Sequence, residues 1–349
     1  MINKYLLGSP EDFNNFVDGI YEKNKIKIIT HVDLDGIASG IFLQKILESK
    51  KLKIDSINFL NYGADVLKDF AEKNDYDFLF FTDWCVDNYP EDLELLRKKG
   101  KVFIIDHHPV NKFLEDKSGI IKTDSGYCSS HCLFDLGKKY FDTKKWEWLV
   151  CSAIISDYTW NKFDNFEFIK KIYPEVKKDS TIWESEPALN GNKISGALVY
   201  YRPDFKKVYD LVLEKNLNEL EKASEIIREE TSRWIEKYKK EAEYFPDEKL
   251  RFYYGLPKYG TSTVASIVSD KYFPNNIIIF ASDVTDKKDF IKISSRTQLE
   301  DVDLGELLKK CIKGFENSDA GGHRKASAAT FPKKYLEKFK ENLLKELKK

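Results

Sequence analysis

One unit repeats between Lys25 and His108: a short apolar stretch, a loop rich in acidic residues, and a segment with helix-spaced apolar residues. The apolar stretches predict strands, and the segments between them predict amphipathic helices. The predicted strands are Ile26–Thr30, Ile54–Leu60, Phe78–Thr82 and Val102–Ile105, and the predicted helices are Ile37–Leu47, Asp65–Lys73 and Pro90–Lys99. Strands and helices that alternate in this way form a parallel sheet with helices on both faces. We therefore expect a doubly wound α/β fold in this part of the chain.

The rest of the chain predicts a second, smaller α/β domain behind a helical connection. Its 349 residues suit two domains, since one domain usually holds roughly 100–200 residues. The stretch from Lys206 to Tyr244 has no Pro or Gly and spaces its apolar residues as a long helix with one buried face does. After Pro246, strand-like and helix-like stretches alternate again. We predict an N-terminal domain over residues 1–203, a helical linker over 204–245 and a second domain over 246–349.

The composition narrows the classes of protein that fit. No apolar run approaches the roughly 18–20 residues that a helix needs to cross a bilayer, and the first residues do not resemble a secretory signal. We therefore expect a cytoplasmic protein that does not bind membranes. Lys and Arg number 57 against 58 Asp and Glu, which argues against a broad basic surface for long duplex DNA. A local basic cleft remains compatible with this balance.

The five cysteines are expected to be free thiols, because their number is odd and no two are spaced as C-x-x-C. Cys128-Ser-Ser-His131-Cys132 has the spacing of half a zinc site, but no second Cys/His pair follows to complete it. This segment stands at the start of a predicted helix. Helix capping or a phosphate contact through Ser129 or Ser130 therefore explains it better than metal binding by His131 does.

Acidic and imidazole side chains follow three of the four predicted strands. In a parallel sheet, ligands bind beyond the carboxyl ends of the strands. A single Asp at such a place often only caps the next helix. Helix capping alone does not account for the His-x-Asp-x-Asp-Gly pattern at 31–36. Alternate residues of an extended segment point the same way, so the pattern can aim three ligand atoms into one space. The residues at these strand ends are His31, Asp33, Asp35, Asp83, Asp106, His107 and His108.

The mixture of carboxylates and imidazoles predicts a metal site. Ser156-Asp157, at the end of a predicted helix from Lys145 to Ile155, is a further contributor. Imidazole with carboxylate suits Mn²⁺ or a similar ion, whereas a set of oxygen ligands alone suits Mg²⁺ or Ca²⁺. At least five such groups can hold two ions, and two ions roughly 3.5–4 Å apart stabilise both oxygens of an in-line phosphoryl displacement.

The second domain carries two short polar motifs, Ser294-Ser295-Arg296-Thr297 and Ala320-Gly321-Gly322-His323. The two glycines can let backbone N–H groups approach an anion, and Arg296 and His323 can add charged donors. The alternative is a tight turn beside a surface arginine.

Together these motifs resemble those of the DHH phosphoesterases, in order and in spacing. His31-Val-Asp33-Leu-Asp35-Gly36, Asp83, Asp106-His107-His108 and Ser156-Asp157 are similar to the four motifs of the catalytic domain, and the two later motifs to those of the DHH-associated domain. The family includes RecJ-type exonucleases and nanoRNases. Many relatives have their first His four residues before the first Asp, where this chain has Ile29, and a third glycine where it has Ala320.

The resemblance implies a DHH catalytic domain over 1–203 that holds two divalent ions, with Mn²⁺ the expected metal. Asp83 would bridge both ions. Asp33 and Asp157 would complete one site, which His31 joins, and Asp35 and His107 would complete the other.

It also implies roles for the remaining motif residues. Asp106 would orient His107, and His108 would face the scissile phosphate as a hydrogen-bond donor. Residues 246–349 would form the substrate-binding domain, with its contacts from Arg296, Gly321, Gly322 and His323.

The activity implied is that of a Mn²⁺-dependent phosphodiesterase that releases nucleoside 5′-monophosphates from short single-stranded RNA or DNA. Dinucleotides such as pApA or cyclic di-AMP, and mononucleotides, are within this substrate class. One alternative is a RecJ-like exonuclease that acts on longer single strands. Another, of a different class, is an inert scaffold of a replication or RNA-decay complex. The oligomeric state stays open, with a homodimer among the outcomes.

Overall fold

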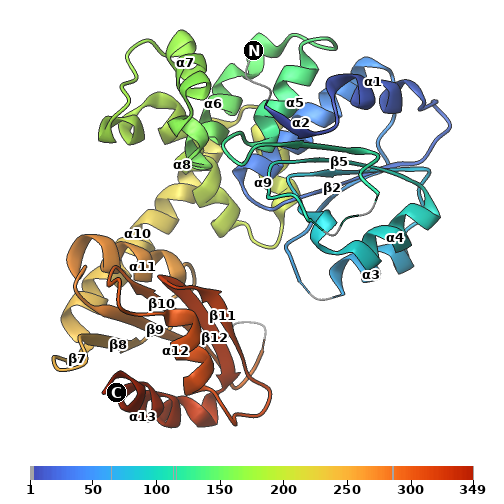
Figure 1. Cartoon of the computed structure of the whole chain (residues 1–349). Helices are drawn as coiled ribbons and strands as arrows, with labels where there is room; N and C mark the ends of the chain where they lie inside the picture. The colour runs from blue at the N-terminus through green and yellow to red at the C-terminus, as the bar shows by residue number, and fades with distance from the viewer. Residues whose placement is uncertain (1–3, 64, 113, 115, 285–286, 349) are drawn as a thin grey trace. The chain divides into compact units, whose positions relative to one another are not determined.

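The apolar stretches of the N-terminal half form a sheet in the computed structural model, which describes residues 4–63, 65–112, 114, 116–284 and 287–348. Every neighbouring pair of strands in this sheet is parallel except the first, because β1 runs antiparallel to β6. In order across the sheet the strands are β1 (Tyr5–Leu7), β6 (Ile120–Thr123), β5 (Lys101–Asp106), β4 (Phe78–Thr82), β2 (Ile26–Thr30) and β3 (Ser56–Phe59) (Figure 1).

Helices cover both faces of this sheet, because successive strand residues point to opposite sides. On one face Phe80 and its neighbours pack in the core formed with α1, α2, α5 and α6. On the other face Phe81 lies with the apolar residues of α3 and α4. These helices are α1 (Pro10–Asp18), α2 (Leu34–Ser49), α3 (Val66–Lys73), α4 (Pro90–Lys99), α5 (Ser129–Gly137) and α6 (Glu147–Ser156). The predicted doubly wound sheet is confirmed.

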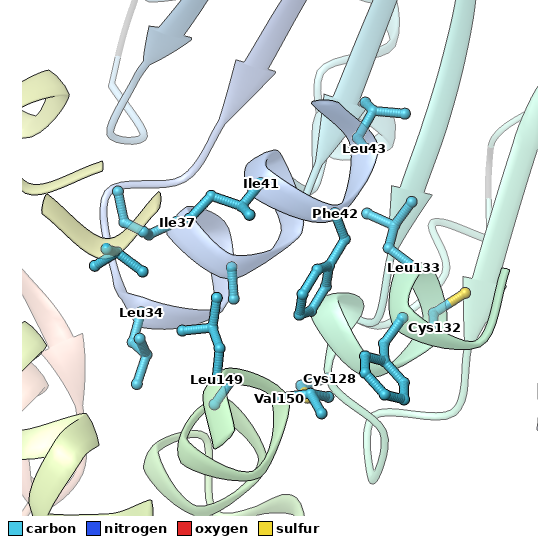
Figure 2. Packing of buried hydrophobic residues seen from close by; sticks show 14 of the residues in the cluster. Leu34, Ile37, Ile41, Phe42, Leu43, Cys128, Cys132, Leu133, Leu149 and Val150 are labelled. Atoms are coloured by element: carbon cyan, nitrogen blue, oxygen red, sulfur yellow. The ribbon is translucent and has the colours of Figure 1, made fainter. Parts of the chain in front are cut away.

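Helix α2 lies at the centre of the larger core. Its residues are apolar around most of the circumference and buried from Leu34 to Leu43. Figure 2 shows Phe42 of α2 close to Leu133 of α5 and Val150 of α6. A helix buried on all sides has one fixed position, so the acidic residues at its N-terminus are held firmly at the edge of the sheet.

Helices α7 (Phe163–Ile172), α8 (Glu186–Tyr200), α9 (Phe205–Leu213) and α10 (Leu217–Glu241) follow. The prediction of a single helix from Lys206 to Tyr244 is wrong. Lys215 adopts a left-handed conformation with φ 54°, and the side chain of Asn216 accepts a hydrogen bond from the Glu219 N–H at 3.2 Å. This local cap ends α9 and starts α10. The chain divides into two units within α10, Met1–Ser224 and Glu225–Lys349.

The C-terminal unit contains a second sheet, in which only β8 and β9 are parallel neighbours among the described strands. Helices α12 (Leu304–Cys311) and α13 (Leu336–Leu347) pack on one face, and α11 (Thr261–Ile267) with the end of α10 packs on the other. Across the sheet the order is β11 (Asp319–His323), β12 (Ala326–Pro332), β10 (Phe290–Thr297), β9 (Ile277–Asp283), β8 (Leu250–Tyr254) and β7 (Glu243–Phe245). The predicted second α/β domain is therefore present.

Two further expectations concern cysteines and membranes. All five cysteines are free thiols, and all are buried. Among the described residues, no helix combines the length and the apolar character needed to span a bilayer.

Candidate metal centre

The turn from β2 into α2 places Asp33 at the sheet edge, where the side chain has two partners. Its Oδ1 accepts the N–H of Gly36 at 2.9 Å, which caps α2, and its Oδ2 lies 2.8 Å from Nδ1 of His31. Gly36 is needed at this turn, because a Cβ there would lie 2.3 Å from the carbonyl oxygen of His31. Capping and metal binding therefore do not exclude each other, since each can use a different oxygen of Asp33.

Asp35, in the first turn of the same helix, caps a different helix. Its two carboxylate oxygens accept the backbone N–H groups of Ser129 at 2.8 Å and Ser130 at 2.9 Å, at the start of α5. The positive end of the α5 dipole thus faces a buried carboxylate. The side chains of Ser129 and Ser130 do not cap α5 as expected; Asp35 caps it instead, and these bonds fix the orientation of its carboxylate.

Asp83 follows β4 and is almost completely buried, at 1% exposure. Its backbone is left-handed, with φ 54°, which is uncommon for a residue other than glycine and is often found at functional sites. Oδ1 lies 3.3 Å from Nε2 of His107, and Oδ2 lies 3.7 Å from Nδ1 of His31. Burial, and then the carboxylates of Asp35 and Asp33, raise the pKa of Asp83 well above its usual value.

The ligand atoms of these side chains converge in three overlapping groups. Within each group, one ligand atom from every residue lies within 4.8 Å of the others. Two of the groups share Asp83, and two share His107. Asp157 joins Asp35 and His107, whereas the family resemblance implied that it would join Asp33. The groups are His31 with Asp33 and Asp83, Asp35 with His107 and Asp157, and Asp83 with His107 and His108.

The second of these groups contains polar atoms that fit a cation. Among the described residues, Nδ1 of His107 and Oδ2 of Asp157 are buried without a hydrogen-bond partner, and they lie 3.7 Å apart. Buried polar atoms of this kind usually have a partner, which can be an ion. Burial, and then the neighbouring Asp35, raise the pKa of Asp157 to about 8. The donor set therefore suits a divalent cation.

Asp106 contacts a different histidine from the one expected. Its Oδ1 lies 2.7 Å from Nδ1 of His108, so the expectation that Asp106 orients His107 is wrong. The physical reason is the extended backbone beyond β5, where residues two apart point to the same side. Burial alone would raise the pKa of Asp106, but His108 and the Lys122 ammonium outweigh it and hold the pKa below its usual range.

A fully buried lysine, Lys122, pairs with the second carboxylate oxygen of Asp106. Nζ of Lys122 lies 2.9 Å from Oδ2 of Asp106 and 2.8 Å from Oδ1 of Asp87, and all three side chains are inaccessible to solvent. Nζ also donates to the carbonyl oxygens of His108 and Pro109. Lys122 therefore fixes the Asp106 carboxylate, which contacts the His108 ring, and also the backbone that carries this ring. Sequence reasoning missed it, because one lysine in a short apolar strand has no distinguishing pattern.

Further side chains surround the ligands. The ring of Tyr62 stacks on His31 with centroids 5.0 Å apart, and its hydroxyl lies 3.4 Å from Nε2 of His108. A cavity of about 400 Å³, within the range of small-ligand sites, opens beside the carboxylates and is also lined by Asn61, Ser195 and Arg202. The sequence singled out none of these, since they lie far from the motifs along the chain.

The predicted phosphate-binding residues lie in β10 and β11 of the second unit, on either side of β12. Ala326 pairs with Arg296 on one side and with His323 on the other, so all three side chains emerge on the same face of the sheet. The Arg296 guanidinium is held by the hydroxyls of Ser266 at 2.8 Å and Ser262 at 2.6 Å. Neither serine was anticipated.

The glycines lie in β11, so the alternative of a tight turn is wrong. Gly321 has open space where a Cβ would stand, which leaves its backbone accessible. Gly322 must be glycine, because its φ is +136° and a Cβ would lie 2.6 Å from the carbonyl oxygen of Ala326. Ala320 is not among the residues with positive φ, so the alanine fits this strand without strain.

Comparison with known proteins agrees with this arrangement. Residues 25–154 match the DHH family, N-terminal domain, and residues 253–349 match the DHHA1 domain. The chain belongs to the DHH family. No curated protein sequence matches this DHH-family chain.

Solved structures share the fold of this DHH-family chain at low identity. An exonuclease RecJ bound to manganese is 14% identical with a TM-score of 0.76, over 97% of this chain and 94% of the other. RecJ from Thermus thermophilus in complex with Mn²⁺ is 15% identical with a TM-score of 0.71, over 97% of this chain and 54% of the other. CDC45 from Entamoeba histolytica is 12% identical with a TM-score of 0.69, over 99% and 100%. These likenesses establish the fold.

His131 lies outside the three groups of candidate metal ligands. Its Nδ1 lies 2.9 Å from the amide oxygen of Asn165, and burial lowers its pKa to about 4. A neutral, hydrogen-bonded core histidine accounts for these contacts, in agreement with the interpretation that His131 is not a ligand.

Proposed function

We propose that this DHH-family chain is a Mn²⁺-dependent phosphodiesterase that hydrolyses short single-stranded oligonucleotides to nucleoside 5′-monophosphates. One observation carries the proposal: seven carboxylate and imidazole side chains converge at the edge of the sheet where its parallel strands end. They form three groups of candidate metal ligands, and Asp83 belongs to two of these groups. A shared carboxylate brings two cations close together. Two divalent ions roughly 3.5–4 Å apart stabilise the attacking and leaving oxygens of an in-line phosphoryl displacement and activate water near neutral pH.

The groups of ligand atoms suggest how the residues would divide between the two ions. His31, Asp33 and Asp83 would hold one ion. Asp35, His107 and Asp157 would hold the other, with Asp83 as the bridge, and this division differs from the one that the resemblance implied only in the place of Asp157. Asp35 is positioned for its ion by the two N–H groups of α5, and Asp33 by the cap of α2.

His108 is proposed as the catalytic donor. Its Nδ1 faces Asp106, which leaves Nε2 on the side of Tyr62. In the imidazolium form, with Nδ1 donating to Asp106, Nε2 can donate a hydrogen bond to a phosphate oxygen or a proton to the leaving group. Asp106 and Lys122 position His108 and do not themselves contact the substrate. Arg296, His323 and the backbone of Gly321 and Gly322 are proposed to bind the substrate phosphate in the second unit.

The choice of metal gives the experiment that tests this function. Protein stripped of metal is expected to be inactive on a short RNA, and Mn²⁺ should restore more turnover than Ca²⁺. The reason is that the proposed ligands include imidazoles, which suit Mn²⁺, whereas Ca²⁺ prefers six to eight oxygen ligands. Initial rates should be measured over a titration of each metal. Equal rescue by Ca²⁺ would contradict the proposed ligand set.

The metal-free protein is expected to lose stability as pH rises. The pKa of Asp157 is raised to about 8, so the folded state retains a proton that the unfolded state releases near pH 4, and this lowers stability from about pH 4 to about pH 8. Burial would lower the pKa of His31, but Asp33 and Asp83 raise it to about 10. The stability that His31 contributes is complete below about pH 6.5 and is lost as pH rises through its folded pKa.

Thermal unfolding between pH 6 and pH 9, with a chelator and with excess Mn²⁺, measures this effect. The trend should reverse with the metal, because metal binding requires deprotonated ligands and strengthens with pH. A metal-free protein whose stability rises over this range would show that these groups are not the ones that titrate.

The second unit predicts a dependence on substrate length. Arg296→Ala and His323→Ala should each lower dinucleotide turnover at least about tenfold, which is about 1.4 kcal/mol, with bound metal unchanged. Binding energy at a terminal phosphate orients the reacting phosphate, and a dinucleotide has few other contacts to replace it. A strand of about twenty nucleotides keeps contacts along its backbone and should lose much less.

Arg324→Ala is the matched control, since Arg324 is an exposed arginine directly after β11, the strand that carries His323. Its loss should leave turnover close to wild type. If neither Arg296→Ala nor His323→Ala lowers the turnover of the short or the long substrate, the proposed role of the second unit is wrong.

Two other functions fit these residues less well. The shared fold with exonuclease RecJ favours, as the second candidate, an exonuclease that acts on longer single-stranded DNA or RNA. An inert scaffold is disfavoured, because the buried carboxylates of Asp35 and Asp83 are costly to keep in a protein with no metal to bind.

A further inference from the structure

We propose that Tyr158, Trp160 and Trp183 form a stacking platform for a nucleobase of the substrate, next to the metal centre. This inference rests on the proposed function and extends it by assigning a place for a base. Tyr158 is 66% exposed and Trp183 is 36% exposed. The ring of Trp183 lies 5.0 Å from that of Tyr158 and 6.2 Å from that of Trp160, between centroids. Single exposed aromatic residues are common, but a contiguous exposed group marks an interaction surface.

The platform adjoins the proposed catalytic site along the chain. Tyr158 directly follows Asp157, so their Cα atoms are about 3.8 Å apart. The proposed aromatic surface therefore begins one residue after a proposed metal ligand. This adjacency to a proposed metal ligand is the reason why we assign the platform to a nucleobase of the substrate.

The backbone at Tyr158 supports a functional role for its side chain. Its φ is 58°, a conformation that glycine or asparagine adopts at lower cost than tyrosine. Strain of this kind is typical of functional sites. The hydroxyl of Thr159 donates to the carbonyl oxygen of Ile154 at 3.1 Å, and the amide of Asn165 donates to the carbonyl oxygen of Thr159 at 2.8 Å. The turn that carries Tyr158 and Trp160 is thus anchored on both sides.

Trp183 comes from a separate segment that is also fixed. It lies in the short helix Ser180–Glu184, whose Ile182 is fully buried. Two segments distant in sequence therefore hold their rings together at the surface. A rigid platform is what stacking needs, since little conformational entropy is lost when a base binds.

Two lysines lie in the segment that carries Trp183, which also contains Asp179 and Glu184. Lys178 is exposed, and its Nζ donates to the carbonyl oxygen of Asn161, the residue after Trp160. Lys177 is exposed beside it. Aromatic rings next to cations are the combination that binds single-stranded nucleic acids, because every base has a π-face and every linkage a negative phosphate.

The experiment compares oligonucleotides in which a single abasic residue is moved through each position of a short substrate. For the wild-type protein, kcat/KM is expected to fall about fivefold or more at one position, which is within the range for the stacking of one base. Trp183→Ala and Tyr158→Asn should lower kcat/KM on the intact substrate by a similar factor and remove the penalty at that position. Asparagine tolerates the left-handed backbone, so Tyr158→Asn tests the ring without adding strain.

The controls separate the possible outcomes. Tyr21→Ala removes a tyrosine of equal exposure, 66%, from another part of the surface and should change nothing. Trp183→Phe should restore most of the loss, because a smaller ring still stacks. If Trp183→Ala and Tyr158→Asn behave like Tyr21→Ala while turnover is normal, the platform does not bind a base, and a protein partner becomes its better explanation. No turnover of any substrate by the wild-type protein would instead contradict the proposed function.

Discussion

Replacing Asp83 by asparagine is expected to lower the turnover of a short oligonucleotide at least about a thousandfold, which is about 4 kcal/mol of activation free energy. Asparagine keeps the shape of the side chain and its contact with the hydroxyl of Ser129, but it removes the charge that two groups of ligands share. Both ions should therefore be lost, and metal analysis should show a content well below wild type.

The same substitution should stabilise the metal-free protein. The pKa of Asp83 is raised by burial and by the carboxylates of Asp35 and Asp33, so a neutral amide avoids the cost of burying a carboxyl group that must either stay charged or take up a proton. Thermal unfolding in a chelator checks this, with Asp69→Asn on the exposed surface of α3 as the control. Wild-type turnover and metal content in Asp83→Asn would contradict the two-metal assignment.

Lys122→Met is expected to destabilise the N-terminal unit by about 3–5 kcal/mol. The methionine has a similar length, but it leaves the carboxylates of Asp87 and Asp106 buried without their shared cation. Removing one member of a buried ionic group is costly, because the remaining charges have lost their solvation and gained no partner. Chemical unfolding with a fluorescence readout measures the change.

Lys73→Met is the matched control for Lys122→Met. Lys73 pairs with Asp69, and both side chains are largely exposed. Exposed pairs contribute only about 0–1 kcal/mol, so this variant should unfold almost as the wild type does. Equal small effects for both lysines would show that the buried ionic group contributes little to stability.

The strand-end acids could be predicted because their positions follow from simple periodicity. The end of β2 is where the apolar run stops, and a parallel sheet brings the residues that follow its strands to one edge. Asp33 and Asp83 were found in this way. The same rule gives no distances, so it could not show that Asp157 lies with Asp35 and His107.

The side-chain partners could not be predicted, because they depend on contacts between segments that are distant in sequence. Lys122 meets Asp87 and Asp106 only when β5 and β6 pair, and Asp35 meets α5 only when α2 packs in the core. The break between α9 and α10 was missed for a local reason. No Pro or Gly marks it, and a lysine in the left-handed conformation ends the helix instead.

The most direct test of the central claim is the release of nucleoside 5′-monophosphates from end-labelled RNA and DNA of two to about twenty-four nucleotides in Mn²⁺, with initial rates compared by length. The account predicts that the wild-type protein releases 5′-monophosphates, fastest from the shortest RNA or DNA, and that Asp83→Asn releases almost none. A wild-type protein that binds two metal ions but releases no monophosphate from any length would contradict it.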